Sequence, residues 1–66
     1  MKTFGDNVRI AREKAGKTQR EMAELIGVAQ SVYCQYETSY KTPNVYLAQK
    51  IAEILNCSVD DLLNGV

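Results

Sequence analysis

Apolar residues recur along this chain at intervals of three and four positions, and no stretch alternates strictly between apolar and polar residues. The first spacing is typical of amphipathic helices that bury one face, whereas alternation would indicate a half-buried β-strand. The pattern therefore predicts an all-α protein with five helices. The expected helices cover residues 4–15, 18–26, 30–38, 45–55 and 59–63.

Capping residues stand at several of the expected helix boundaries. Thr18 is followed three positions later by Glu21, which is the capping-box pattern, and Asn44 and Ser58 precede the fourth and fifth helices. Left-handed turns are expected where helices end, at Gly16, Gly27 and Asn56.

The apolar stripes of the helices define an expected hydrophobic core. Its expected members are Phe4, Val8, Ala11, Ala15, Met22, Leu25, Ile26, Tyr33, Tyr36, Val45, Ala48, Ile51, Ala52 and Leu55. Tyr33 and Tyr36 could instead stack on nucleic-acid bases, as in single-strand binders. They share the apolar side of their helix, so core packing is the favoured interpretation.

Composition and charge describe a small folded domain. With 66 residues, 45% of them hydrophobic and 24% charged, the chain has the composition of one globular domain, expected to span residues 1–66. The net charge is zero, but residues 1–20 carry six basic residues against two acidic ones, whereas residues 21–66 carry two against six. This asymmetry could mark an anion-binding face, or it could reflect ordinary solvated helix surfaces.

Several function classes lack their usual residues. The chain has no His, no CxxC motif and only two cysteines, Cys34 and Cys57, so no metal site is expected. It has no Gly-rich phosphate loop and no nucleophile beside a base, so we expect neither enzyme activity nor a cofactor. No apolar stretch approaches the roughly 18 residues of a membrane span, which favours a cytoplasmic location with reduced thiols.

Two long segments carry a resemblance to a known family. They read FGDNVRIAREKAGKTQREMAELIGVAQSVYCQYE and TPNVYLAQKIAEILNCSVDDLL, and Gly16, Ala23 and Gly27 stand at family positions. From Phe4 to Leu63 the chain resembles the Xre/Cro/phage-repressor family of bacterial and phage DNA-binding domains. The resemblance implies a lambda-repressor-like domain with a helix-turn-helix motif at about residues 19–38. In that motif the third helix enters the major groove of DNA and the second crosses the phosphate backbone.

The resemblance also implies which side chains meet DNA. Gln30, Ser31 and Gln35 would read bases, because an amide can pair with the N6 and N7 edge of adenine. Gln19 would hold a phosphate oxygen at the start of the second helix and could brace Gln30. The other contacts to the DNA backbone are expected from Lys17, Thr18, Arg20, Thr38, Lys41, Thr42 and Asn44.

Other positions would shape the domain around these contacts. Arg12 and Glu37 are expected to form an internal ion pair between the first and third helices. Ala29 replaces the usual Ser or Thr cap and Ser39 replaces a common Gly, so a missing cap and a strained turn are expected there. Cys34 would border the groove, either as a redox-sensitive thiol or, as we favour, as a plain small residue.

Together these features predict a sequence-specific, double-stranded DNA-binding transcriptional regulator, most simply a repressor that occupies an operator. A homodimer is expected, because two half-sites one helical turn apart supply the needed specificity. Leu62, Leu63 and Val66 are the candidate dimer residues. The alternative is a protein-interaction or antitoxin-like module with the same fold, which would use the acidic half of the chain, residues 45–66.

Overall fold

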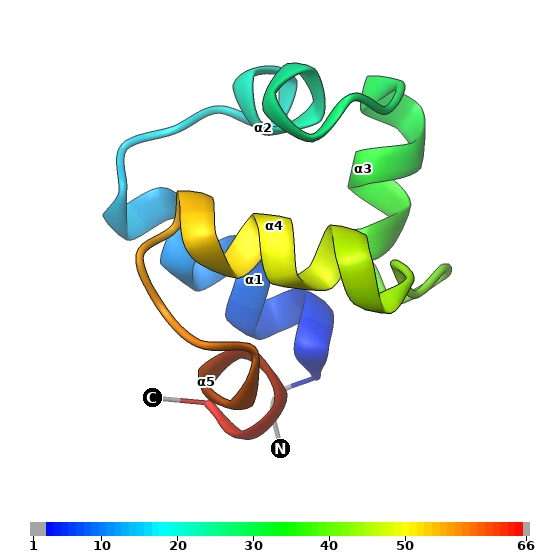
Figure 1. Cartoon of the computed structure of the whole chain (residues 1–66). Helices are drawn as coiled ribbons and strands as arrows, with labels where there is room; N and C mark the ends of the chain where they lie inside the picture. Colours follow the sequence, from blue (N-terminus) through cyan, green and yellow to red (C-terminus); the bar gives the residue numbers. More distant parts are fainter. Residues whose placement is uncertain (1–2, 66) are drawn as a thin grey trace.

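The computed structural model describes residues 3–65, and these form five α-helices joined by short turns and loops (Figure 1). The helices are α1 (Phe4–Lys14), α2 (Gln19–Ile26), α3 (Gln30–Glu37), α4 (Val45–Ile54) and α5 (Val59–Asn64). Each helix begins and ends within one residue of the range expected from the sequence. The all-α prediction is therefore confirmed in its number and order of elements.

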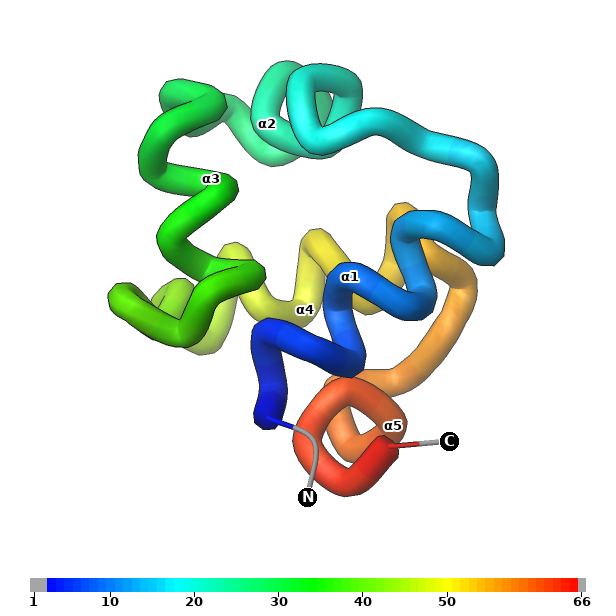
Figure 2. The backbone as a smooth tube through the Cα atoms, turned by 180° about the vertical axis from the view of Figure 1, so that it is seen from behind, coloured from blue at the N-terminus to red at the C-terminus, as the bar shows by residue number. Residues whose placement is uncertain are grey.

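The helices surround one core and leave α3 at the side of the molecule. α2 packs against α3 and α4, α1 packs against α3 and α5, and α4 also contacts α5. The view from behind in Figure 2 shows α1 between α3 and α5, with α2 at the top of the molecule and α5 at the bottom. Because α1 and α2 both support α3 from within, the remaining side of α3 faces outward.

The helix starts follow the capping chemistry expected from the sequence. Thr18 and Ser58 each form a complete capping box, and so does Thr3 before α1. The Asn44 side chain accepts a hydrogen bond of 2.8 Å from the backbone N–H of Leu47. Ala29 has the extended backbone of a cap but provides no side-chain hydrogen bond, as expected. Helix α3 therefore begins with backbone N–H groups that no capping side chain occupies.

The turns are left-handed at the expected positions. Gly16, Gly27 and Asn56 have φ values of 71°, 78° and 59°. Ser39, directly after α3, has a φ of 64°, which costs a residue with a Cβ about 1–2 kcal/mol. The Ser39 hydroxyl donates to the Thr3 hydroxyl at 3.1 Å, so this turn is also tied to the start of α1.

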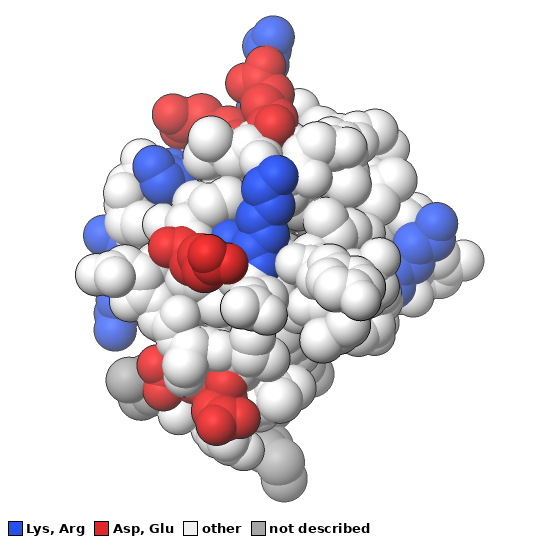
Figure 3. Space-filling view, in the orientation of Figure 1, with Lys and Arg blue, Asp and Glu red and all other residues white. Residues whose placement is uncertain are grey.

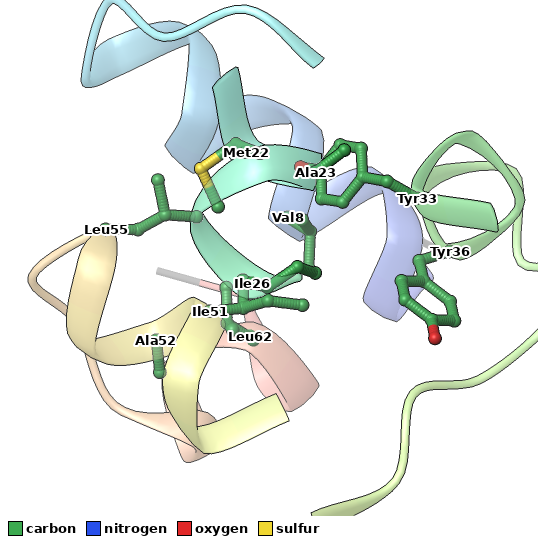
Figure 4. Packing of buried hydrophobic residues seen from close by; sticks show 10 residues of the cluster. All are labelled: Val8, Met22, Ala23, Ile26, Tyr33, Tyr36, Ile51, Ala52, Leu55 and Leu62. Atoms are coloured by element: carbon green, nitrogen blue, oxygen red, sulfur yellow. The ribbon is translucent and has the colours of Figure 1, made fainter. Parts of the chain in front are cut away.

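The core takes one fully buried large side chain from each helix: Val8, Met22, Tyr33, Ile51 and Leu62. Figure 4 shows these side chains converging from the surrounding helices, with Ala23 and Ala52 lining the same space. Tyr33 is completely buried, so the core interpretation of this tyrosine is confirmed.

Three of the expected core residues lie at the surface instead. Leu25 is 47% exposed, because the buried side of α2 is centred on Met22, Ala23 and Ile26 and leaves Leu25 at its edge. Val45 is 69% exposed, since it begins α4 before that helix meets the core. Ala15 is exposed because it follows the last residue of α1.

Gly5 allows α1 to approach α3 closely. A Cβ atom added at Gly5 would overlap the carbonyl oxygen of Glu37 and lie 2.6 Å from that of Tyr36. Only a residue without a side chain fits there. The close approach fixes the end of α3 against α1, and no local signal in the sequence marks this glycine.

In residues 3–65, none of the helices has the length and apolar character that crossing a membrane requires.

Candidate nucleic-acid interface

One side of α3 presents a polar surface whose side chains are not used within the fold. Gln30 and Ser31 are exposed and Gln35 is half-buried. Within the described part of the chain, none of these three side chains forms a hydrogen bond. On the opposite side of the helix, Tyr33 and Tyr36 are buried. The three residues expected to read bases therefore share an outward face that the core holds in place.

The Gln19 side chain lies at the junction of α2 and α3 and bonds to α3 through both ends of its amide. Its Nε2 donates to Glu37 Oε1 at 3.0 Å, and its Oε1 accepts from Cys34 Sγ at 3.2 Å. Among the described residues, no hydrogen bond links Gln19 to Gln30. The amide keeps one N–H hydrogen beyond the bond to Glu37, and this hydrogen remains available to a phosphate oxygen.

The expected ion pair between Arg12 and Glu37 is present and buried. Arg12 Nε lies 2.7 Å from Glu37 Oε2, and the side chains are only 12% and 3% exposed. A second bond joins Arg12 Nη2 to Glu37 Oε1 at 3.3 Å, and Arg12 Nη1 donates to the carbonyl oxygen of Lys17 at 2.8 Å. One guanidinium thus connects α1, the turn before α2 and the end of α3.

Charges and hydrogen bonds keep this pair ionised. Burial alone would raise the pKa of Glu37, but the side chains of Arg12, Tyr33 and Gln19 together hold that pKa below its ordinary value. The hydrogen bond to Glu37 raises the pKa of Arg12 above its ordinary value. The ionised carboxylate can therefore accept from both Arg12 and Gln19, which fixes α3 relative to α1 and α2.

The Tyr33 hydroxyl lies beside this pair. It is close enough to lower the pKa of Glu37, yet it forms no hydrogen bond of ordinary geometry in the described residues. Burial raises the pKa of Tyr33 far above its ordinary value, so the hydroxyl stays protonated.

The residues expected to contact the DNA backbone lie around α3 and at the start of α2. Lys17 is half-buried, and the others are exposed: Thr18, Arg20, Thr38, Lys41, Thr42 and Asn44. Thr18 and Asn44 use their side chains as helix caps, so their contribution to a ligand would come from the adjoining helix starts. The Thr38 hydroxyl donates to the carbonyl oxygen of Gln35 at 3.2 Å.

The charged side chains are unevenly spread over the visible surface. In Figure 3, basic and acidic groups alternate over α2 and the middle of α4, and acidic groups gather at the bottom over α5. Asp60 and Asp61 both lie in the first turn of α5. The acidic end of the domain is therefore remote from α3, and Lys17, Arg20 and Lys41 provide the positive charge near the helix-turn-helix.

The prediction that Leu62 contributes to a dimer contact is wrong. Its side chain is 2% exposed and belongs to the core, because α5 packs this face onto α1 and α4. Leu63 is 57% exposed and stays a candidate. Val66 lies outside the described residues.

Exposed apolar side chains also occur in the loop between α3 and α4 and at the start of α4, where the sequence pattern did not predict them. Tyr40, Val45 and Tyr46 are 78%, 69% and 82% exposed. Figure 3 shows a broad surface without charged side chains over the N-terminal part of α4. The spacing of apolar residues along a helix cannot predict this group, because Tyr40 lies in a loop and the other two residues lie in the first turn of α4.

A groove of about 460 Å³ lies between α1, the end of α4 and α5. It is lined by Asn7, Ile10, Ala11, Lys14, Ala15, Leu55, Asn56, Cys57, Asp61, Leu62 and Gly65. Burial, with a smaller effect of Asp61, raises the pKa of Cys57, so this thiol stays protonated. The described residues contain no group of three or more His, Cys, Asp or Glu side chains that could hold a metal ion.

A model of the helix-turn-helix family matches residues 8–62, which include all of α2, α3 and α4. The chain belongs to the helix-turn-helix family. The resemblance inferred from the sequence is thereby confirmed. The family's named members among the relatives are transcriptional regulators, which agrees with the expectation that this helix-turn-helix protein is not an enzyme.

Two relatives illustrate the similarity in sequence. The chain is 34% identical over 61 residues to the HTH-type transcriptional regulator ImmR of Bacillus subtilis, covering 92% of this chain and 48% of that protein. It is 37% identical over 51 residues to the cryptic phage CTXphi transcriptional repressor RstR of Vibrio cholerae, covering 77% of this chain and 46% of that protein. The chain thus spans about half the length of these helix-turn-helix regulators.

Solved structures show the same fold in proteins bound to DNA. The P22 c2 repressor in complex with a synthetic operator matches with a TM-score of 0.91 at 29% identity, covering 100% of both chains. SinR, a master regulator for biofilm formation solved in complex with DNA, matches with a TM-score of 0.82 at 30% identity, covering 91% of this chain and 97% of that one. The lambda-repressor-like fold expected from the sequence is confirmed.

Proposed function

We propose that this helix-turn-helix domain binds operator DNA as a transcriptional regulator, with α3 in the major groove. The observation that carries the proposal is the outward polar face of Gln30, Ser31 and Gln35, whose side chains are free while the rest of α3 is fixed by the core. A rigid helix with unpaired amides on its outward side suits the reading of adenine edges. The similarity to the P22 c2 repressor, solved with its synthetic operator, supports this function.

We propose that the start of α2 holds the DNA backbone. The remaining N–H of Gln19 and the backbone N–H groups of the first turn can donate to a phosphate, aided by the helix dipole. Lys17, Arg20 and Lys41 would add charge on either side. Because the net charge of the chain is zero, binding depends on this local group and should weaken steeply as salt rises.

The proposed functional unit is a homodimer of a single helix-turn-helix domain covering residues 1–66. Two copies would place two α3 helices on successive half-sites, and the regulator would repress by occupying its operator in the cytoplasm of a bacterium. Leu63, which is 57% exposed, is the remaining candidate from α5 for the contact between copies. Sedimentation of the wild-type protein and of Leu63→Glu, with and without operator, tests this contact.

Selection of bound sequences from a random duplex pool tests the function and supplies the operator. With that operator, Gln30→Ala should weaken binding by about 1–3 kcal/mol and relax the preference at one base position. Gln19→Ala should weaken binding to operator and random duplex alike. Gln49→Ala removes an exposed amide from α4 and serves as the control, with unchanged affinity.

Two results would count against the proposal. If the wild-type protein binds no duplex even at low salt, the protein-interaction module becomes the better explanation. If Gln30→Ala and Gln19→Ala bind every duplex as tightly as Gln49→Ala does, α3 and α2 do not have the proposed roles.

A further inference from the structure

The Cys34 thiol forms a hydrogen bond that its position alone would not suggest. Cys34 lies in the second turn of α3, and its Sγ donates to Gln19 Oε1 across the junction with α2 at 3.2 Å. The thiol is half-buried, so it is enclosed by the junction without being part of the core. The bond joins the helix that would read bases to the residue that would hold the phosphate.

This bond matters because it helps to decide which way the Gln19 amide points. Ionised Glu37 can only accept hydrogen bonds, so it selects the NH₂ end of the amide, which lies 3.0 Å away. The carbonyl end then needs a donor, and the Cys34 S–H is the side chain that supplies it. A flipped amide would place its oxygen against the Glu37 carboxylate. Cys34 and Glu37 therefore hold the amide from its two ends.

The position of Cys34 also places it next to the residue expected to read a base. Gln30 precedes Cys34 by four residues in α3, and side chains at this spacing are neighbours on a helix surface. The Gln19 amide thus lies close to α3 along the same side as Gln30. If the amide rotated away, the N–H offered to the phosphate would lose its fixed direction.

We propose that Cys34 is a positioning residue for the contact between Gln19 and the DNA backbone. By donating to Gln19 Oε1, the thiol fixes the amide so that its second N–H points to the phosphate when α3 enters the groove. This inference rests on the proposed DNA-binding function. It assigns Cys34 a role beyond that of the plain small residue favoured from the sequence, and it needs no oxidation of the thiol.

A double-mutant cycle on DNA binding tests this role. The four proteins are the wild type, Cys34→Ala, Gln19→Ala and the double variant, titrated with the selected operator at fixed salt and well below their melting temperatures. Cys34→Ala should raise Kd about threefold to fivefold, as expected for one modest hydrogen bond that organises a binding group. In the Gln19→Ala background, the same change should alter Kd by less than about 1.5-fold.

Two further variants separate positioning from a general loss of structure. Cys34→Ser keeps a hydroxyl donor and should recover most of the wild-type affinity, although Ala is the better helix former. Cys57→Ala removes the other thiol, which lies in the groove between α1 and α5, and should leave Kd unchanged. Thermal melting of each variant is measured alongside, because a structural role would follow stability and not the presence of Gln19.

The possible results separate the positioning role of Cys34 from the DNA-binding function on which it rests. Equal losses on Cys34→Ala with and without Gln19, or a Cys34→Ser protein as weak as Cys34→Ala, would overturn the positioning role while leaving the DNA-binding function intact. A wild-type protein that binds no duplex would overturn both.

Discussion

Replacing Gly5 by alanine sets two opposing effects against each other. In an isolated helix, alanine is preferred to glycine by about 1 kcal/mol, so α1 alone would gain stability. In the folded protein the new Cβ would overlap the carbonyl oxygen of Glu37. It would also lie 2.6 Å from the carbonyl oxygen of Tyr36, which is 0.8 Å short of the 3.4 Å at which ordinary van der Waals contact begins.

The clash should outweigh the gain in helix propensity. Both obstructing atoms belong to the backbone, so no side chain can rotate away and α1 must retreat from α3. Overpacking of this kind costs about 3 kcal/mol or more, which leaves a net loss of about 2 kcal/mol. A domain of 66 residues has a total stability of about 3–10 kcal/mol, so this loss is a substantial part of it. A loss of this size should lower the melting temperature by about 8–16 °C.

Thermal unfolding followed by circular dichroism measures the effect, with Gly16→Ala as the control. A Cβ at Gly16 meets nothing within 4 Å, and its φ of 71° should cost about 1–2 kcal/mol with no clash added. We expect Gly5→Ala to melt below Gly16→Ala, and its affinity for operator to fall because α3 is displaced. A Gly5→Ala protein that melts at or above the wild-type temperature would show that the two helices can separate freely.

Two further predictions concern the ends of α3. Ala29→Ser should stabilise the protein by about 1 kcal/mol, because Ala29 already has the backbone of a cap and lacks only the hydroxyl; an unchanged melting temperature would contradict this. The pKa of Glu37 is lowered in the folded protein, so its contribution to stability is present above its unfolded pKa and is lost as the pH falls through the folded value. Below about pH 5 the free energy of unfolding of the wild type should therefore fall more steeply than that of Glu37→Gln. Parallel slopes in denaturant titrations across this range would refute the assignment to Glu37.

The sequence predicted the helices well because most of their boundaries have a local chemical cause. Thr18 with Glu21, Asn44 and Ser58 act on backbone groups within three residues, so their effect does not depend on the rest of the fold. The left-handed turns at Gly27 and Asn56 are local in the same sense.

Features that depend on contact between distant residues were harder to predict. Leu25 and Val45 have the right spacing for a core, but which side of a helix is covered depends on where its neighbours end. Gly5 meets α3 more than thirty positions later in the chain, and the bond between Cys34 and Gln19 requires the crossing of two helices. The pair of Arg12 and Glu37 was expected only because the family resemblance supplied that distant contact.

The single core built from all five helices has a consequence for how this protein could change over time. Residues such as Met22 and Tyr33 are shared by the whole fold, so α2 and α3 would not survive as a separate peptide. By contrast, the side chains of Gln30 and Ser31 are exposed and do not belong to the core. If α3 reads DNA as proposed, substitutions at these two positions would change the sites that the protein binds with little effect on folding, so closely related copies could diverge in the genes they control while keeping the same fold.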